Sequence, residues 1–365
     1  VDFYGLYRDG QLQGGMSIHD YTMNFFSKKM RVMGVGAIAV DLLYKKEKVC
    51  KEMISYFHKH CKENGVHVSI LYPFRSDFYK KMGYGYGTKM NRYHFRPNNL
   101  PRGRSKSNIR YLQKEDVKAV LDCYTSYVER THGTILRTER DILRLIANPR
   151  LKAVGYLKEG QCYGYIVFKF EDAKKDNWIL NNIVIQEFIY ENAEVLTELL
   201  TFLNTQDDQI HRIIFSTQEE NFHFLLKDPR NHSHHIFKTS QETNQQGVGI
   251  MYRVLDTKEF FKQLSDHNFN NQTCKLKLSI TDTFLPENHR SIIVHFENGK
   301  AKVNEDEFEV EISLDVAEFS SLVMGVITFK ELYQYGLVTI SSPAYVEIIN
   351  SLFLTKEKPI CLTQF

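Results

Sequence analysis

The stretch from Met33 to Met53 limits what this chain can fold into more than any other part of it. Its first half, Gly34–Val40 (GVGAIAV), is small and apolar throughout, which predicts a strand covered on both faces. The basic segment Tyr44–Lys48 follows, and apolar residues then recur at helical spacing through Val49–Cys61. Asn64-Gly65 ends that helix, because glycine accepts the positive φ of a helix C-terminus. The stretch therefore predicts a strand, a tight basic turn and a helix.

A strand that leads into a helix with lysines in its first turn is suited to binding phosphate. The backbone N–H groups of that turn have no partner within the helix, and the positive end of the helix dipole lies there. Lysines in a first turn are also common as solvated surface residues, and on the pattern alone this second interpretation is the more frequent one. The rest of the sequence has to decide between the two.

The segments on either side of this unit complete a mixed α/β pattern. Before it, Phe3–Arg8 and Leu12–Phe26 predict a hairpin joined at Asp9-Gly10, a strong turn signal. After it, the pattern predicts a strand at Val66–Leu71, a short helix at Ser76–Met82 and a final strand at Tyr84–Phe95. This order of strands and helices is typical of a layered α/β sandwich.

A linker rich in Pro, Gly, Ser and Asn, residues 97–108, leads to a second copy of the same pattern over Ile109–Leu255. Its elements are two helices at Lys114–Arg130 and Thr138–Asn148, a hairpin joined at Glu159-Gly160, a central strand at Trp178–Ile185, a helix at Glu191–Asn204, and strands at Ile210–Ser216 and Gly247–Leu255. The turn after its central strand, Phe188–Asn192, is acidic and lacks lysine. Because an acidic turn repels a pyrophosphate, we expect the second copy to be structural.

The pattern of apolar and polar residues changes again from about Asp256. A helix at Lys258–Ser265 and a helix at Asp315–Met324 alternate with strands, and a hairpin is expected around Asn298-Gly299. These elements suggest a small α+β domain of the lipid-carrier kind. The chain is apolar to its last residues, 359–365, whereas most termini are polar and frayed, so we expect this end to be docked. The predicted domains are residues 1–105, 106–256 and 257–365.

Composition excludes several classes of function. The chain has 365 residues, too many for one ordinary core, with 42% hydrophobic and 25% charged residues and a net charge of +3. The charge is nearly balanced and no basic block occurs, which argues against nucleic acid as a partner. The apolar runs are far shorter than a membrane span, and no secretory signal is visible. The sequence therefore predicts a cytoplasmic protein.

Cysteine and histidine usage gives no sign of a disulfide framework or a metal centre. The six cysteines form no CxxC pair and fit small core residues in a reducing compartment. A group of His232, His234, His235 and Asp228 invites a metal interpretation, but it lacks the helical spacing and cysteine pairs that metal sites commonly use. We expect no metal.

One longer match is specific. The segment Leu71–Gly87 (LYPFRSDFYKKMGYGYG), taken with Gly36–Met53, resembles the GNAT N-acetyltransferases. More narrowly, the chain is similar to the Eis-type group over nearly its whole length. That resemblance implies an α/β (α+β) fold of two tandem GNAT mixed-sheet domains followed by a small sterol-carrier-like domain. It also implies acetyl-CoA as co-substrate, a primary amine as acceptor, and a homo-oligomer, often a hexamer.

The resemblance also carries roles onto individual residues of this sequence. It implies that the pantetheine arm of the cofactor pairs with Ile38, Ala39 and Val40. It places further cofactor contacts at Phe74 and Arg75. The turn that would receive the pyrophosphate comprises Lys45, Lys46, Glu47, Lys48, Val49, Cys50 and Lys51.

Two catalytic roles follow in the same way, Tyr79 as general acid for the leaving thiolate and the C-terminal carboxylate of Phe365 as general base. An acceptor amine must lose a proton before it attacks a thioester, and a carboxylate can collect that proton directly or through water. A phenol titrates near 10 and a thiol near 8.5, close enough for the acid role. On pattern alone, Tyr79 is more often a core residue and Phe365 a buried anchor; only the resemblance reverses both interpretations.

The sequence departs from the family pattern in two places. The GNAT turn usually carries glycine where this chain has Lys48, and the lysine could either crowd the pyrophosphate or bind it through its ammonium group. Glu47 does not help an anion. The first GNAT unit also normally begins with a strand and two helices that shape the acceptor pocket, and Val1 starts after them, so the chain could be incomplete and inactive.

Three hypotheses result. The first is an acetyl-CoA-dependent N-acetyltransferase whose acceptor is an aminoglycoside, a polyamine-like cation or a lysine side chain. The second is a non-catalytic protein that uses the GNAT units as a scaffold and holds an apolar ligand in its C-terminal domain. The third is a purely structural subunit of an oligomer. Co-purified lipid without affinity for acetyl-CoA would distinguish the second hypothesis from the first.

Overall fold

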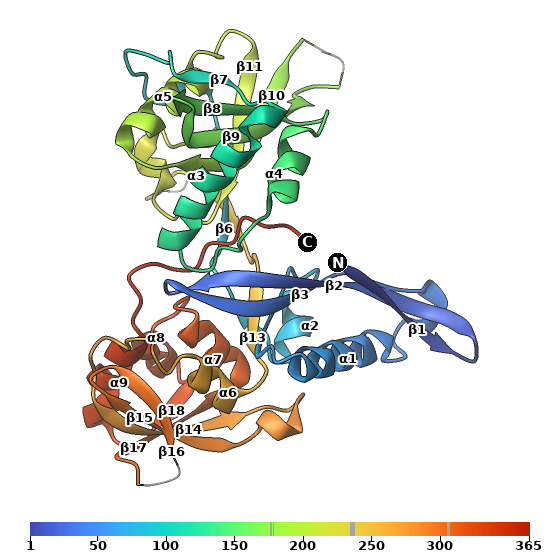
Figure 1. Cartoon of the computed structure of the whole chain (residues 1–365), viewed down its shortest axis with the longest axis vertical. Helices are drawn as coiled ribbons and strands as arrows, with labels where there is room; N and C mark the ends of the chain where they lie inside the picture. The colour runs from blue at the N-terminus through green and yellow to red at the C-terminus, as the bar shows by residue number, and fades with distance from the viewer. Residues whose placement is uncertain (176, 178, 234–237, 305–306) are drawn as a thin grey trace. The chain divides into compact units, whose positions relative to one another are not determined.

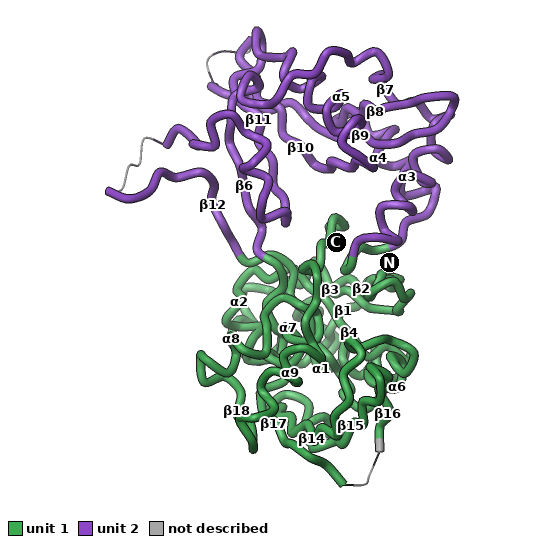
Figure 2. The backbone as a smooth tube through the Cα atoms, turned by 90° about the vertical axis from the view of Figure 1, so that its left-hand side faces the viewer, with its two compact units in different colours: residues 1–88, 132–135, 248–365 green, residues 89–131, 136–247 purple. Residues whose placement is uncertain are grey.

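The chain forms two compact units. The computed structural model describes residues 1–175, 177, 179–233, 238–304 and 307–365. The first unit holds residues 1–88, 132–135 and 248–365, and the second holds residues 89–131 and 136–247 (Figure 2). None of the described helices is long and apolar enough to cross a membrane.

A six-stranded sheet forms the first half of the first unit. Its strands, in spatial order, are β1 (Asp2–Arg8), β2 (Gln11–Phe25), β3 (Lys28–Val40), β4 (Val68–Leu71), β13 (Met251–Val254) and β5 (Gly85–Tyr86). Neighbouring strands are antiparallel except β3 and β4, which are parallel. Helix α1 (Val49–Glu63) lies along β2 and β3, and α2 (Ser76–Lys80) follows β4 (Figure 1). The hairpin predicted at Asp9-Gly10 is confirmed, with φ of 50° and 75° at the two turn residues.

The rest of the first unit is the third part of the sequence. A five-stranded sheet contains β16 (Lys300–Asn304), β15 (Ser291–Glu297), β14 (Cys274–Thr281), β17 (Val310–Asp315) and β18 (Val338–Ile340), in that order. Its helices are α6 (Thr257–Gln263), α7 (Val316–Val323), α8 (Phe329–Gln334) and α9 (Val346–Phe353). The predicted turn at Asn298-Gly299 is confirmed, whereas α8 was not predicted. One apolar core, which includes Val68, Tyr252 and Phe319, is continuous between the two sheets of this unit.

A seven-stranded sheet forms the second unit. Its strands, in spatial order, are β12 (Asn244–Gly247), β6 (Met90–Phe95), β11 (Ile210–Thr217), β10 (Asn181–Tyr190), β9 (Gln161–Asp172), β8 (Lys152–Lys158) and β7 (Ile109–Tyr111). The helices are α3 (Val117–Arg130), α4 (Glu139–Ile146) and α5 (Ala193–Asn204). The described residues also contain six short 3-10 segments: Leu42–Tyr44, Pro97–Asn99, Lys114–Asp116, Phe222–Leu225, Pro286–Asn288 and Pro343–Tyr345. The predicted central strand is displaced along the sequence, and Trp178 lies outside the described residues.

Two predicted strands are wrong, and both errors have the same cause. The segment Tyr84–Phe95 is not one strand: β5 belongs to the first sheet and β6 to the second. The segment Gly247–Leu255 divides in the same way into β12 and β13. The chain changes sheets at Gly87 and Ile250, which share a backbone hydrogen bond of 3.0 Å. Each α/β sheet therefore contains a strand from the other half of the sequence, and the three predicted domain ranges stay a proposal.

The expectation that Gly34–Val40 is covered on both faces is also wrong in part. Gly34 and Val35 are buried, but Ala37 and Ala39 are exposed. Among the described residues, β4 pairs with β3 only at Met33 and Gly34, so the last part of β3 extends beyond its parallel neighbour.

Candidate active site

The outer part of β3 offers unpaired backbone groups. Between the pairs Ser17–Gly36 and Gly15–Ala39, two residues of β3 oppose one residue of β2, which makes a β-bulge, and Ala37 has φ of 47°. Because β4 pairs with β3 no further than Gly34 in the described structure, the edge formed by residues 36–40 is free on that side. An extended ligand chain can add to such an edge through main-chain hydrogen bonds. Ile38 and Val40 are half-buried and Ala39 is exposed there.

The basic turn follows directly. Lys45, Lys46, Glu47, Lys48 and Lys51 are exposed, Val49 is buried and Cys50 is half-buried. Lys48 precedes α1 with φ of 66° and makes no side-chain cap, so the first N–H groups of the helix are not taken by that residue. A left-handed conformation is the one that glycine adopts freely. The lysine thus keeps the backbone shape of the glycine that it replaces.

The acidic residue in this turn is partly neutralised. Arg8 of β1 lies 3.9 Å from the Glu47 carboxylate and donates a hydrogen bond of 2.5 Å to Glu52 of α1. These groups are partly exposed, so each contact contributes little to stability. The arginine still adds positive charge beside the lysines, which favours an anion at this turn.

Tyr79 is buried on the short helix α2, with 2% of its surface exposed. Its ring contacts Phe74, with centroids 5.6 Å apart, and Tyr84, with centroids 6.0 Å apart. Burial, and then the neighbouring thiol of Cys50, raise the pKa of Tyr79 above its ordinary value. Phe74 is exposed, and Arg75 is paired with Asp77 at 2.5 Å on the surface.

A buried ion pair holds the loop that follows Tyr79. Arg253 of β13 donates to both carboxylate oxygens of Asp282, at 3.0 and 2.8 Å, and to the carbonyl of Met82. Both charged side chains are fully buried. Gly83 has φ of 81°, and a Cβ there would lie 1.3 Å from a guanidinium nitrogen, so only glycine fits.

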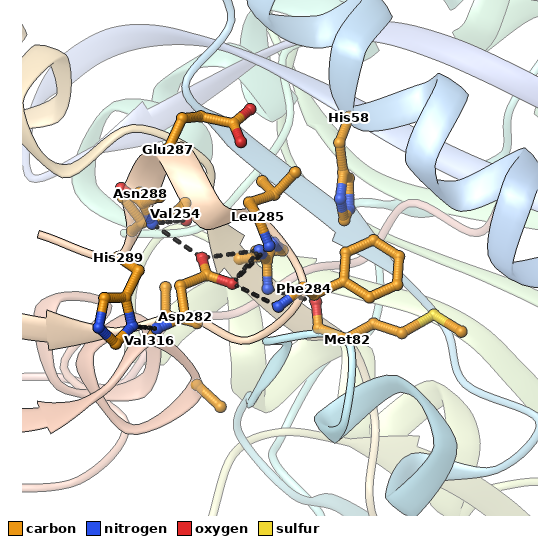
Figure 3. Close-up of polar contacts among 12 residues, drawn as sticks. His58, Met82, Val254, Asp282, Phe284, Leu285, Glu287, Asn288, His289 and Val316 are labelled. Carbon is orange, nitrogen blue, oxygen red and sulfur yellow. Dashed lines mark hydrogen bonds and ion pairs between the residues drawn. The ribbon is translucent and has the colours of Figure 1, made fainter.

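Asp282 is itself well satisfied. It accepts hydrogen bonds from the backbone N–H groups of Phe284 and Leu285 and from the side-chain amide of Asn288 (Figure 3). The third part of the sequence therefore fixes the segment that carries Tyr79. Sequence analysis missed this pair, although an arginine inside the apolar run MYRVL was a signal, because a buried charge needs a partner.

The C-terminus is docked against β3, which confirms the prediction for the tail. A Cβ on Gly34 would lie 2.6 Å from the Phe365 ring, and one on Gly36 would lie 2.8 Å from the carboxyl carbon of Phe365. Only residues without a side chain allow this approach. The Phe365 ring also contacts His19, Tyr21 and Tyr72, with centroids 5.4, 5.5 and 5.3 Å away.

Three hydrogen bonds anchor the tail, residues 359–365. Thr88 donates to the carbonyl of Pro359 at 2.7 Å, and Tyr72 donates to the carbonyl of Thr363 at 3.1 Å. The N–H of Ile360 donates to the carbonyl of His132 at 2.8 Å. The terminal carboxylate is therefore held beside the bulge and the free edge of β3.

Side chains of β2 form a polar row beside the tail. Ser17 Oγ lies 2.9 Å from His19 Nε2, and the Tyr21 hydroxyl lies 3.1 Å from His19 Nδ1. Burial lowers the pKa of His19, so the ring is neutral at pH 7. Sequence analysis did not select these residues, although three polar side chains at alternate positions of an apolar strand place them on one face.

Comparisons with known proteins agree with this geometry. Residues 1–87 and 127–254 each match an acetyltransferase (GNAT) domain, and residues 257–362 match a sterol carrier protein domain. The two GNAT matches together cover more than half of the chain. The chain belongs to the GNAT acetyltransferase family. Its domain arrangement is that of the Eis type, and it is an acyltransferase by family.

Solved structures with the same fold span the whole chain of this GNAT protein. A GCN5-related N-acetyltransferase from Anabaena variabilis is 17% identical, with a TM-score of 0.82 and 89% of its own chain covered. A probable N-acyltransferase from Enterococcus faecalis is 18% identical, with a TM-score of 0.83 and 88% covered. Eis1 from Mycobacterium abscessus is 18% identical, with a TM-score of 0.77 and 90% covered. A search of curated proteins found no match.

The metal interpretation gains no support in this GNAT protein. Asp228 is paired with Arg230 at 2.7 Å, and His234 and His235 lie outside the described residues. The part of the chain that the structure describes contains no group of three or more side chains suited to a metal ion. All six cysteines have free thiols, and five of them are buried, as core cysteines are.

Proposed function

We propose that this protein transfers an acetyl group from acetyl-CoA to a primary amine. The observation that carries the proposal is the position of the Phe365 carboxylate, beside the β3 bulge and next to the free strand edge. A thioester bound along that edge would have its acyl carbon close to a fixed negative group. A carboxylate in that place can take the proton that the acceptor's ammonium group must lose before the amine attacks.

The free edge and the basic turn suit the two ends of the cofactor. Ile38, Ala39 and Val40 offer main-chain groups to the pantetheine amides, and a strand N–H can polarise the thioester carbonyl. The turn from Lys45 to Lys51 offers ammonium groups and the N-terminus of α1 to the pyrophosphate. Phe74, with 69% of its surface exposed, offers an apolar face at the start of α2. Arg75 offers its charge there only if it leaves Asp77.

Tyr79 is the proposed general acid. Its raised pKa keeps the hydroxyl protonated at neutral pH, as an acid must be before it acts. A thiolate that leaves in the same buried surroundings has its own pKa raised by desolvation, which keeps donor and acceptor matched. The buried pair between Arg253 and Asp282 holds the loop after α2 and so limits how far Tyr79 moves.

The acceptor is proposed to be cationic. The half-buried rings of Tyr21 and Tyr72 lie around Phe365, and aromatic faces beside a carboxylate favour an ammonium group. Aminoglycosides, polyamine-like cations and lysine side chains all present such a group. The alternative of an apolar ligand in the C-terminal domain has less support, because side chains of the domain pack against one another in its core. Five phenylalanine rings there form a chain of contacts, in the order Phe260, Phe261, Phe269, Phe296 and Phe353.

The test is thiol release from acetyl-CoA with a panel of amines. Wild-type chain should release thiol with at least one cationic amine, and one glycine added after Phe365 should abolish most of this activity by displacing the carboxylate. Phe365→Leu is the matched control, because it keeps a terminal carboxylate at the same position and should retain more activity than the extended chain. Full activity in the extended chain would overturn the role of the carboxylate.

A further inference from the structure

The polar row of Ser17, His19 and Tyr21 lies beside the proposed base, and the proposed function uses only the ring face of Tyr21. Ser17 Oγ lies 3.3 Å, and the carboxyl carbon of Phe365 lies 2.8 Å, from the point that a Cβ on Gly36 would occupy. The two groups are therefore neighbours across a residue that has no side chain. His19 is hydrogen-bonded on both ring nitrogens, to Ser17 on one side and to Tyr21 on the other.

The position of this row matters because the Phe365 carboxylate alone is a weak base for an ammonium group. A terminal carboxylate titrates at about 3.3–3.7, so near pH 7 it has little affinity for the proton of an ammonium group. A general base works best when its pKa is near the operating pH, and imidazole is closer to that value than a carboxylate. A neutral imidazole has one N–H and one free nitrogen, which is the arrangement that passes a proton through the ring.

We propose that Ser17, His19 and Tyr21 form a proton relay that removes the proton from the Phe365 carboxylate during turnover. The inference rests on the acetyl-transfer function proposed above. The carboxylate takes a proton from the acceptor amine and passes it through an intervening water molecule to Ser17 Oγ, as the Ser17 proton moves to His19 Nε2. The proton on His19 Nδ1 moves to the Tyr21 oxygen, and the Tyr21 proton moves to water. Each of the three side chains gains one proton as it loses another, so the amine has lost one proton and solvent has gained one. His19 ends with its proton on Nε2, and exchange with solvent restores the Nδ1–H tautomer before the next turnover.

Ser17, His19 and the Tyr21 hydroxyl act through the base, because the relay requires none of these groups to touch the substrate. Tyr21 is partly exposed, which gives the row an end that solvent can reach. The neighbouring residues Met16 and Ile18, on the opposite face of β2, are buried. A purely structural role would not require three consecutive members on one face to be linked by hydrogen bonds.

His19→Phe is the variant that tests the relay. It keeps an aromatic ring against Phe365 and Tyr21 but removes both hydrogen bonds of the row. We expect kcat for thiol release to fall about 100-fold, the low end of the usual contribution of one acid–base group. The KM for acetyl-CoA should stay the same, and added imidazole should restore much of kcat. Circular dichroism would verify that the variant is folded.

Tyr72→Phe is the matched control, because it removes a hydroxyl from the same cluster but outside the row. Any loss that it causes comes from a looser tail and should not respond to imidazole. A folded His19→Phe protein with wild-type kcat, or with a loss that imidazole does not restore, would overturn the relay alone. A wild-type chain that releases no thiol with any amine would overturn the acetyl-transfer function and the relay with it.

A nuclear magnetic resonance measurement tests the connection between His19 and the Phe365 carboxylate without an activity assay. Wild-type protein and the chain with one glycine added after Phe365 are both labelled with nitrogen-15. The ring resonances of His19 should differ between the two proteins, because the added glycine displaces a nearby negative charge. His295, in the C-terminal domain, is the internal reference and should not shift. An unchanged His19 signal in the extended chain would contradict the connection between the row and the carboxylate.

Discussion

The two GNAT domains share an irregularity in the central strand but place different residues beside it. In both, a central strand is parallel to the next strand and is interrupted by a register shift, between Gly36 and Ala39 in β3 and between Ile185 and Glu187 in β10. In the first domain, Gly34 and Gly36 leave room at this place, and the terminal residue Phe365 enters it. In the second domain the chain places a charged side chain there instead.

That side chain is Glu187, which belongs to a buried network. Arg137 donates to the carboxylate with nitrogen–oxygen distances of 2.8 and 2.7 Å, and the Tyr165 hydroxyl donates at 2.5 Å. The Arg137 guanidinium lies 4.3 Å from the centre of the Tyr124 ring. Both charged side chains are at most 9% exposed. The polar groups at this shift in the second domain are thus satisfied from within the protein.

The turns after the central strands differ in the same sense. Asn192 caps α5 by accepting the N–H of Val195 at 3.1 Å, and Glu191 adds negative charge. Lys48 makes no such cap, and the same turn also carries Lys45, Lys46 and Lys51. The fold thus provides two helix N-termini after a central strand, and the residues at each one decide how well it suits an anion.

The largest effect expected is that of Tyr79→Phe. Removing the proposed acid should lower kcat by about 10²–10³-fold, with little change in acetyl-CoA binding by calorimetric titration. Tyr165→Phe, in the second domain, is the matched control: it removes a buried hydroxyl and should lower stability but not turnover per folded molecule. If Tyr79→Phe keeps wild-type kcat, the first domain does not use this hydroxyl as an acid.

Breaking the buried pair of the second domain should cost about 3–5 kcal/mol of unfolding free energy. Arg137→Met leaves the Glu187 carboxylate buried without its partner, which is the costly case for a buried ion pair. Chemical denaturation would measure the loss, and the double variant Arg137→Met with Glu187→Leu should recover much of it. Activity per folded molecule should not change. A drop in kcat of the folded protein would show that the second domain does more than support the fold.

Much of this contrast could be predicted from sequence, because its signals are local. The turns at Asp9-Gly10, Glu159-Gly160 and Asn298-Gly299 depend on residues that accept positive φ, and all three are found. The acidic and basic turns were also distinguished. The exchange of β6 and β13 between sheets could not be predicted, since each strand pattern is satisfied equally by either sheet. The approach of Phe365 to Gly36 joins the two ends of the chain, and no local pattern records such a contact.

Acid should loosen the tail that distinguishes the first domain. The Nδ1 atom of His132 accepts the N–H of Phe26, its Nε2–H donates to the carbonyl of Met324, and burial lowers its pKa to about 4. The neutral ring therefore contributes stability that is fully present above its unfolded pKa of about 6.5 and is lost as pH falls through 4. The contribution is about 3 kcal/mol.

Unfolding free energies of wild type and His132→Phe, measured between pH 7 and pH 4, would test this. The variant keeps the stacking on Phe26 and should show a shallower dependence on pH. Some slope should remain, because burial also lowers the pKa of His267 to about 4. Equal slopes in both proteins would mean that His132 does not titrate on unfolding.

The smallest effect expected, and the one that most sharpens the comparison, is that of Lys48→Gly. Glycine relieves the left-handed φ of 66° but costs more entropy on folding, so stability should rise by about 1 kcal/mol or less. Because Lys48 already has the left-handed conformation that glycine would adopt, we expect the loss of one exposed positive charge to dominate, so that acetyl-CoA binds about 2–5-fold more weakly. The difference should disappear at high salt.

Lys48→Asn separates the two contributions, since asparagine tolerates the same φ and lacks the charge. It should weaken binding as much as glycine does, with a smaller gain in stability. If Lys48→Gly instead tightens acetyl-CoA binding in calorimetric titration while Lys48→Asn does not, the side chain obstructs the pyrophosphate. The Lys48 side chain would then hinder an anion at the turn of the first domain, as an acidic residue and a cap do at the turn of the second. The two turns would differ less in their suitability for an anion than their charges indicate.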